Sequence, residues 1–169
     1  EPPLFIVQKM GKSGFLGVKV PPEYGGAGLD TMAITILNEE LERVSAGIAA
    51  TILAHVGLAL GPLQRLGTHE QKLKYLVPGV KGEKIGAFGL TEPGGGSDVA
   101  GMKTTAVKKN GRYLINGSKT FITNGNIADF IILAAKTDPH KRAKGISLFI
   151  VEKGTPGFTT GKKLRKIGW

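Results

Sequence analysis

The stretch from Gly89 to Gly101, GLTEPGGGSDVAG, combines glycines with hydroxyl and carboxyl side chains. Glycine lets main-chain N–H groups come close to a ligand, and loops of this kind commonly bind phosphate. The spacing nevertheless excludes two common nucleotide loops. Met102 separates Gly101 from Lys103, so the lysine of a P-loop is out of register. A Rossmann fingerprint fails because Val99 stands where its third glycine is required.

The other reactive side chains form no recognisable constellation. The chain has no cysteine, which excludes disulfides and thiolate metal sites. Its histidines, His55, His69 and His140, are too far apart in sequence to form a metal-binding motif, so no metal site is predicted. Glu92 precedes Pro93 in the glycine-rich stretch. We interpret it as a structural carboxylate of the loop and not as a catalytic base.

The charge of the chain is unevenly distributed. Its 23 Lys and Arg against 13 Asp and Glu give a formal net charge of +10, and residues 84–169 carry the whole excess. This leaves two interpretations open: charged hairpin ends exposed to solvent, or a site for an anionic cofactor or thioester ligand. The basic clusters lack the aromatic platform or recognition helix of a nucleic-acid-binding protein, so we expect no nucleic acid partner.

The first half of the chain has a helical hydrophobic pattern. In LDTMAITILNEELERVS, apolar residues recur at helical spacing after Asp30, a suitable N-cap. The next segment, AGIAATILAHVGLALGPLQRLG, is almost entirely apolar before Pro62, which predicts a buried helix. Thr68 and Gln71 have the spacing of a capping box and introduce a third helix, which we expect to end at Pro78.

From Lys84 onward the pattern changes to strand-like runs separated by turn dipeptides. These runs are KIGAFGL, KTTAVKK, RYLING, SKTFITNG, DFIILAAKT and ISLFIVEK. Three Asn-Gly pairs favour hairpins, so the region is predicted to be antiparallel. The predicted fold class is therefore α+β. An α-helical segment, residues 1–82, is followed by an antiparallel β-barrel or sandwich domain, residues 83–169.

Five motifs, in this order, resemble the acyl-CoA dehydrogenase family. They are PPEYGGAGLD, LGTHEQKLKYL, AFGLTEPGGGSDVAG, INGSKTFITNG and LFIVEKGTPGF. The resemblance covers essentially the whole chain. It implies a flavoprotein with an N-terminal helical domain, a middle β-domain and a C-terminal helical domain. This chain would lack the C-terminal domain and the first helices of the N-terminal one.

The same resemblance implies that two of the motifs bind FAD. The residues expected to contact FAD are Phe88, Leu90, Thr91, Gly96, Ser97, Phe121, Ile122 and Thr123. Thr91 would address the pyrimidine end of the flavin ring, and Thr123 would lie near its N5 atom. Phe121 stands where the family often has tryptophan, so an aromatic wall is kept while the indole N–H is lost.

The reaction implied by the resemblance is the α,β-dehydrogenation of a fatty or branched-chain acyl-CoA thioester. Ser97, Ala143 and Lys144 would contact the acyl-CoA, and an electron-transfer flavoprotein would accept the electrons. The base of the family is a glutamate of the C-terminal domain. No catalytic residue is therefore expected in this chain, which alone should be inactive, while the whole protein would form a homotetramer.

Two alternatives to a dehydrogenase remain open. The same scaffold could belong to an acyl-CoA oxidase or a related flavin monooxygenase, or the chain could be a binding fragment without catalysis of its own. No signal peptide and no uninterrupted apolar run of membrane-spanning length is recognised in the sequence. We therefore expect no transmembrane segment and a location in the cytoplasm of a bacterium or in the mitochondrial matrix of a eukaryote.

Overall fold

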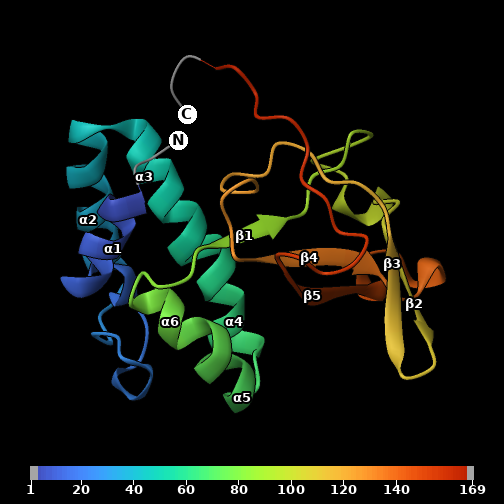
Figure 1. The fold of residues 1–169 in the computed structure, drawn as a ribbon, viewed down its shortest axis with the longest axis horizontal. Coiled ribbons are helices and arrows are strands. Elements are labelled where there is room, and N and C mark those ends of the chain that lie inside the picture. The colour runs from blue at the N-terminus through green and yellow to red at the C-terminus, as the bar shows by residue number, and fades with distance from the viewer. Residues whose placement is uncertain (1–3, 167–169) are drawn as a thin grey trace.

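Helices occupy the first half of the chain and strands the second half (Figure 1). The computed structural model describes residues 4–166. Its α-helices are α1 (Leu4–Lys12), α2 (Thr31–Val44), α3 (Ala46–Leu53), α4 (Gly61–Leu66), α5 (His69–Gln71) and α6 (Val77–Val80). Its strands are β1 (Gly86–Gly89), β2 (Thr105–Lys109), β3 (Arg112–Asn116), β4 (Phe130–Lys136) and β5 (Ile146–Glu152). This order confirms the predicted α+β class.

Two predicted helix starts are present. The Asp30 side chain accepts a hydrogen bond from the Ala33 N–H at 3.1 Å and so caps α2. At α5, the Thr68 side chain accepts from the Gln71 N–H at 3.3 Å, and the Gln71 side chain accepts from the Thr68 N–H at 3.0 Å. These reciprocal bonds form the capping box and satisfy donors that an open helix end would leave unpaired.

The apolar segment forms one continuous helical stretch, Ala46–Leu66, in which the π-helical turn η3 (Ala54–Leu60) joins α3 to α4. By length and composition alone this stretch could cross a membrane, since its mean hydropathy is 1.7. Half of it is buried inside the fold. Ile52, Leu60 and Leu63 are nearly inaccessible to solvent. The helix therefore serves as a core element of the fold, and the predicted burial is confirmed for this half.

The helix that begins at α5 does not end at Pro78. A π-helical turn, η4 (Lys72–Leu76), follows α5, and α6 then runs through Pro78 to Val80. Proline inside an α-helix lacks the N–H donor and collides with the carbonyl four residues earlier. In both long helices the proline follows a π turn, whose wider pitch changes the local bonding pattern. The prediction that Pro78 ends this helix is therefore wrong.

The strands form one sheet in which the order β1-β4-β2-β3 makes one path and β5 pairs with β4. β2 and β3 form the predicted hairpin, turned by Asn110 and Gly111, both with positive φ. The β4–β5 pair is also antiparallel, whereas β1 runs parallel to β4. The sheet is therefore mixed and not purely antiparallel. Because β1 and β4 are parallel, the long connection between them, which includes β2 and β3, must bring the chain back to the end of the sheet at which β1 begins.

The run SKTFITNG is not a strand, contrary to its alternating pattern. Residues 117–129 form turns and loop structure before β4. Phe121 and Asn124 have φ angles of 57° and 67°, which are incompatible with extended backbone. The alternation of apolar and polar residues there reflects packing of Ile122 under a turn and not a sheet edge.

The helices and the sheet share one hydrophobic core. Leu60, Leu63 and Leu76 pack in the same cluster as Phe130 and Ile132 of β4. Polar contacts join the two parts as well. The Tyr75 hydroxyl donates to Glu152 Oε1 of β5 at 3.0 Å, and Lys74 forms an ion pair with the same oxygen at 3.0 Å. The predicted division between residues 82 and 83 stays a prediction.

Candidate functional site

The glycine-rich loop leaves β1 and makes a tight turn at once. The Glu92 N–H donates to the Gly95 carbonyl at 3.0 Å, and the Gly95 N–H donates to the Glu92 carbonyl at 3.1 Å. A Cβ added at Gly95 would meet nothing within 4 Å, so alanine also fits there. Further along, the Asp98 side chain accepts from the Gly101 N–H at 3.0 Å. Asp98 thus braces the loop through a local side-chain to main-chain hydrogen bond.

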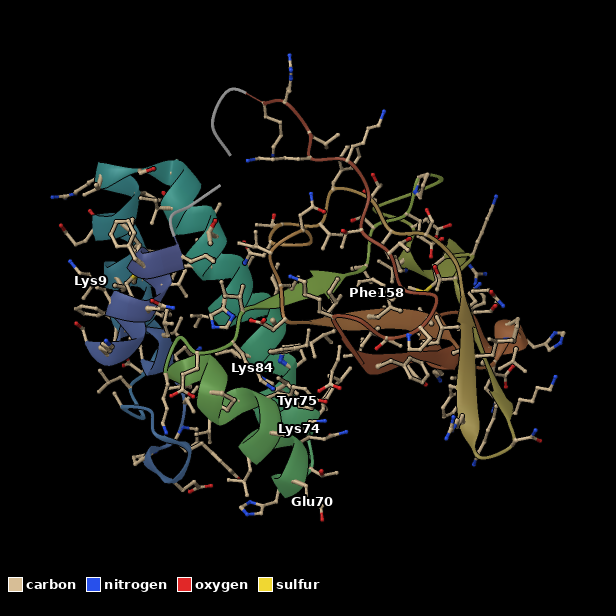
Figure 2. All side chains as sticks on the ribbon, in the orientation of Figure 1. Lys9, Glu70, Lys74, Tyr75, Lys84 and Phe158 are labelled. Atoms are coloured by element: carbon tan, nitrogen blue, oxygen red, sulfur yellow. The ribbon has the colours of Figure 1, made fainter. Side chains whose placement is uncertain are left out.

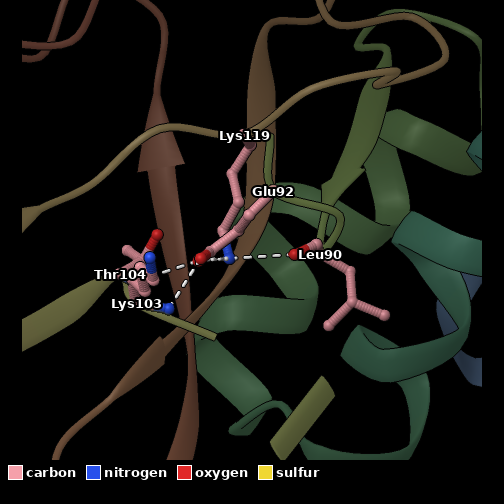
Figure 3. A network of polar contacts seen from close by, with 5 residues as sticks. All are labelled: Leu90, Glu92, Lys103, Thr104 and Lys119. Atoms are coloured by element: carbon pink, nitrogen blue, oxygen red, sulfur yellow. Dashed lines mark hydrogen bonds and ion pairs between the residues drawn. The ribbon is translucent and has the colours of Figure 1, made fainter. Parts of the chain in front are cut away.

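A buried ion pair anchors this loop to the segment that follows β3 (Figure 3). The ammonium of Lys119 lies 2.8 Å from Glu92 Oε1 and donates to the Leu90 carbonyl at 3.0 Å. The two Glu92 oxygens also accept from the main-chain N–H groups of Lys103, at 2.6 Å, and Thr104, at 3.0 Å. The side chains of Glu92 and Lys119 are each 8% exposed.

These contacts keep Glu92 ionised. Burial by itself would raise the pKa of the Glu92 carboxyl, but the hydrogen bonds from Lys119, Thr104 and Lys103 outweigh burial and lower this pKa to about 2. A base that removes a weakly acidic proton needs a free lone pair facing the substrate and a pKa near the working pH. Glu92 has neither property, which agrees with its interpretation as a structural carboxylate.

The loop that contains Phe121 lies beside the glycine-rich loop. The Thr120 N–H donates to the Thr91 carbonyl at 2.9 Å, so the two predicted cofactor motifs are hydrogen-bonded neighbours. The Asn124 side chain donates to the Thr51 carbonyl of α3 at 2.9 Å and fixes the far end of the loop on the helical part. The Phe121 ring nevertheless points outward and is 74% exposed.

Phe121 combines two unfavourable features. A φ of 57° places its backbone in the left-handed region, which costs a non-glycine residue about 1 kcal/mol or more. Its aromatic side chain also gains little from burial, because most of the ring faces solvent. Strain of this kind persists where the surrounding bonds enforce it, and it concentrates at ligand sites. Phe121 is therefore the strongest single indication of a binding surface in the described chain.

The structure does not bring all predicted cofactor residues to one side of the sheet. Phe88 packs with Ile132 in the core shared with the helices. Ile122 packs in a different cluster, with Ile131. Neighbouring residues of a strand point to opposite faces, so Phe88 and Ile122 lie on opposite sides of the sheet. The remaining residues of the two motifs lie beyond the end of β1, on the two loops that meet at Thr91 and Thr120.

The donor groups of these loops fit a flavin. Within residues 4–166, the hydroxyls of Thr91, Ser97 and Thr123 form no hydrogen bond with the protein, which leaves them available to a ligand. Gly96 is exposed, and the nearest atom to a Cβ added there would be Thr91 Cγ2 at 3.5 Å. A flat exposed aromatic ring beside free hydroxyl and amide donors suits an isoalloxazine with a phosphate-bearing tail.

The predicted acyl-CoA residues lie on a second basic segment. Ala143 and Lys144 are exposed on the 3₁₀ segment η6 (Pro139–Gly145), which contacts η5 (Val99–Gly101), two residues after Ser97. The structure thus places Ser97 two residues before η5 and Lys144 on the adjacent η6. Inside η6, Arg142 has a φ of 48°, so it joins Phe121 and Asn124 among the non-glycine residues with positive φ on these segments.

Sequence reasoning missed three positioning residues. Lys119 lies inside the motif INGSKTFITNG, but nothing in the sequence indicated its partner. Asn124 was treated only as part of an Asn-Gly turn. His55 belongs to no motif in the sequence, yet it is 1% exposed, and its ring bonds both the Gly79 carbonyl and the Gly86 N–H at 3.0 Å. Such contacts join residues far apart in sequence, so no local pattern indicates them.

One of two cavities in the described chain lies away from these loops, and the other borders the loop of residues 117–129 through Asn126 and Ala128. One, of about 520 Å³, separates α4 and α5 from β5 and has Glu70, Lys74 and Tyr75 in its lining (Figure 2). The other, of about 350 Å³, lies next to Phe158 (Figure 2). Neither is lined by a residue predicted to bind cofactor or substrate. Within residues 4–166, no group of three or more His, Asp or Glu side chains could hold a metal ion.

Comparisons with known proteins agree along the whole chain. The sequence model "Acyl-CoA dehydrogenase, N-terminal domain" matches residues 1–83, and the model "Acyl-CoA dehydrogenase, middle domain" matches residues 87–169. An acyl-CoA dehydrogenase of Bacillus subtilis is 49% identical over 168 residues, which cover 99% of this chain and 44% of that protein. The caffeyl-CoA reductase-Etf complex subunit CarC of Acetobacterium woodii is 48% identical over 169 residues, with 99% and 44% covered.

A solved structure supports the same relationship. The FAD complex of PigA has a TM-score of 0.92 and 38% identity, covering 97% of this chain and 43% of that chain. The chain thus spans less than half the length of each of these similar proteins.

Proposed function

Because the chain belongs to the acyl-CoA dehydrogenase family, we propose that it forms the helical and β parts of an FAD-dependent oxidoreductase. The proposed reaction is the α,β-dehydrogenation of acyl-CoA thioesters. The observation that carries the proposal is the exposed Phe121 ring on a left-handed backbone, next to a loop whose hydroxyls have no partner within residues 4–166. Strained, exposed residues of this kind concentrate at ligand sites, which supports a bound cofactor here.

Phe121, Thr91 and Thr123 would hold the flavin ring. Bound FAD supplies a hydride acceptor. Phe121 offers one flat apolar wall, which excludes water from one face of the ring and limits its tilt. The hydroxyls of Thr91 and Thr123 would orient the ring edge through hydrogen bonds, and Ser97 with the Gly96 main chain would meet the pyrophosphate.

The acyl-CoA would lie along the exposed side of η6 and of the loop that leads into η5. Ser97 is positioned to meet the thioester-bearing ligand, and Lys144 offers a positive charge to its phosphates. The excess of basic side chains in residues 84–169 supports an anionic ligand on this half of the molecule. The Ala143 main chain would pack against the same ligand, since its methyl side chain has neither a charge nor a hydrogen-bonding group.

The base that removes the α-proton would come from outside residues 1–169. Glu92 is fully engaged by the Lys119 ammonium and two main-chain N–H groups. We propose that a carboxylate from the remaining length of the protein faces the flavin across the substrate, and that residues 1–169 alone turn over no acyl-CoA. The whole protein is proposed to form a homotetramer and to pass electrons to an electron-transfer flavoprotein.

The relationship to a subunit of a caffeyl-CoA reductase-Etf complex favours a second candidate reaction, reduction of an α,β-unsaturated acyl-CoA. This reaction would use the same flavin site beside Phe121, with hydride moving from the flavin to the substrate.

An oxidase remains the third candidate. Reoxidation of the reduced whole protein by air, with stoichiometric peroxide, would favour the oxidase. Slow reoxidation by air together with fast electron exchange with an electron-transfer flavoprotein would favour the other two.

The test measures FAD retention in the whole protein. Thr91→Val and Thr123→Val each remove one hydroxyl from the proposed ring site. Each should weaken FAD binding by about 1 to 3 kcal/mol, because a buried polar partner on the ring loses its hydrogen bond. Thr35→Val is the matched control, since the exposed Thr35 hydroxyl donates only to the Thr31 carbonyl on α2. Equal FAD retention in all three variants would refute the assigned site.

A further inference from the structure

Lys119 makes a second contact besides its ion pair with Glu92, and this contact is not needed to neutralise the Glu92 charge. Its ammonium donates to the Leu90 carbonyl at 3.0 Å in addition to pairing with Glu92 (Figure 3). Glu92 already accepts two main-chain hydrogen bonds, from Lys103 and Thr104. The Leu90 contact therefore directs a buried positive charge at one particular peptide, the one that joins Leu90 to Thr91.

That peptide links the charge to the proposed cofactor site. The described chain has no cis peptide bond, and in a trans peptide the C=O and N–H groups point in opposite directions. With Lys119 on the Leu90 carbonyl, the Thr91 N–H therefore points away from the ammonium. Within residues 4–166, this N–H donates no hydrogen bond to the protein.

A charged donor on a carbonyl polarises the whole peptide unit. Hydrogen bonds in a chain strengthen one another, and the effect is larger in a buried setting, where water screens little. The Lys119 side chain is 8% exposed, so its charge acts in such a setting. The Thr91 carbonyl is held in turn by the Thr120 N–H at 2.9 Å, which fixes the orientation of the next peptide. The Thr91 N–H is thus both oriented and strengthened as a donor.

We propose that Lys119 is a positioning residue that polarises the Leu90–Thr91 peptide and makes the Thr91 N–H a stronger donor to the more electron-rich, reduced form of the bound flavin. This inference rests on the proposed function. Reduction increases the negative charge on the ring, so a stronger donor favours the reduced form over the oxidised form. Lys119 would raise the reduction potential of the cofactor without touching it.

A purely structural Lys119 would act differently. If the ammonium only compensated the Glu92 charge, its loss would leave a buried unpaired carboxylate and weaken the fold or FAD retention in general. Removing both charges together would then restore normal behaviour. The double variant Glu92→Gln/Lys119→Met therefore separates the two roles, because it leaves no orphaned charge while the Leu90 carbonyl still loses its charged donor.

The experiment compares the whole protein with three variants: Lys119→Met, Lys119→Arg and the double variant. Lys108→Met is the matched control, since Lys108 is an exposed lysine of the same charge on β2. Dissociation constants of oxidised FAD and the two-electron reduction potential are measured for each protein. Thermal unfolding without FAD shows that each variant is folded.

We expect the double variant to lose about tenfold in its preference for reduced over oxidised FAD, which lowers a two-electron potential by about 30 mV. Lys119→Arg keeps a charged donor and should stay within a few millivolts of the starting protein, as should Lys108→Met. A wild-type potential in the double variant would overturn the inference. So would an equal loss of binding for both flavin forms, which indicates packing only. Failure of the unmodified protein to bind FAD would instead refute the proposed function.

Discussion

His55 should make the stability of this chain fall on mild acidification. The imidazole is buried at the junction of three elements: the helix Ala46–Leu66, α6 and β1. Gly86 donates its N–H to Nδ1 at 3.0 Å, so Nδ1 carries no proton, and Nε2–H donates to the Gly79 carbonyl at 3.0 Å. Together the two bonds define this one neutral tautomer, because a proton on Nδ1 would remove the acceptor of the Gly86 N–H.

Burial lowers the pKa of His55 below 6.5, although its bonds to Gly79 and Gly86 and the charge of Asp129 oppose that shift. Below about pH 6.5, His55 binds a proton in the unfolded chain but stays neutral in the folded chain until a lower pH. Stability should therefore fall as the pH drops below about 6.5, by at most about 1.4 kcal/mol for each pH unit. With a urea m-value of about 2 kcal/mol/M, the unfolding midpoint moves down by at most about 0.7 M for each pH unit.

The assay is urea unfolding of residues 1–169 between pH 7.5 and 5, with His55→Gln as the control. Glutamine keeps one donor and one acceptor but does not titrate, so its stability should lack this part of the pH dependence. His55→Leu should be less stable than the wild type at every pH. It leaves the buried Gly86 N–H and Gly79 carbonyl unpaired, which costs about 1 to 3 kcal/mol for each group. Parallel stability curves for wild type and His55→Gln from pH 7.5 to 5 would refute the reasoning.

Three further predictions concern the loops and the core. Phe121→Asn should leave the cofactor-free chain as stable or up to about 1 kcal/mol more stable in urea, because asparagine tolerates a left-handed φ, and should weaken FAD retention by the whole protein. Glu92→Gln should flatten acid unfolding between pH 5 and 2, since a carboxyl with a pKa near 2 stabilises the fold above about pH 4.5 and loses that effect as pH falls. An unchanged acid transition would contradict that network. Gly86→Ala should cost about 1 to 3 kcal/mol in thermal or urea unfolding, because the added Cβ would lie 2.8 Å from the Phe130 ring.

Much of the secondary structure could be predicted from local residue patterns. Asp30 and the pair Thr68 and Gln71 cap their helices because a cap depends on residues within three positions of one another. The β2–β3 hairpin follows from Asn110 and Gly111 for the same reason. The run SKTFITNG misled, because alternation describes which residues are buried and does not distinguish a strand from a packed loop.

Strand direction and the geometry of the candidate site could not be predicted in this way. β1 pairs in parallel with β4 although more than forty residues separate them, and the Asn-Gly turns contain no information about that pairing. Likewise, the motif containing Lys119 was recognisable as a motif, while its contact with the Leu90 carbonyl required the two loops to be placed side by side.

The sequence by itself determined the family, the order of helices and strands, the basic character of the second half and the two motifs that are proposed to bind the cofactor. Each of these depends on residue identity and on short-range spacing. The tertiary structure alone decided that Glu92 is a paired anchor, that Phe121 is exposed on a strained backbone, and that His55 is a neutral buried link. Burial and long-range hydrogen bonds set the charge state and orientation of these side chains, and both arise only when distant segments pack together.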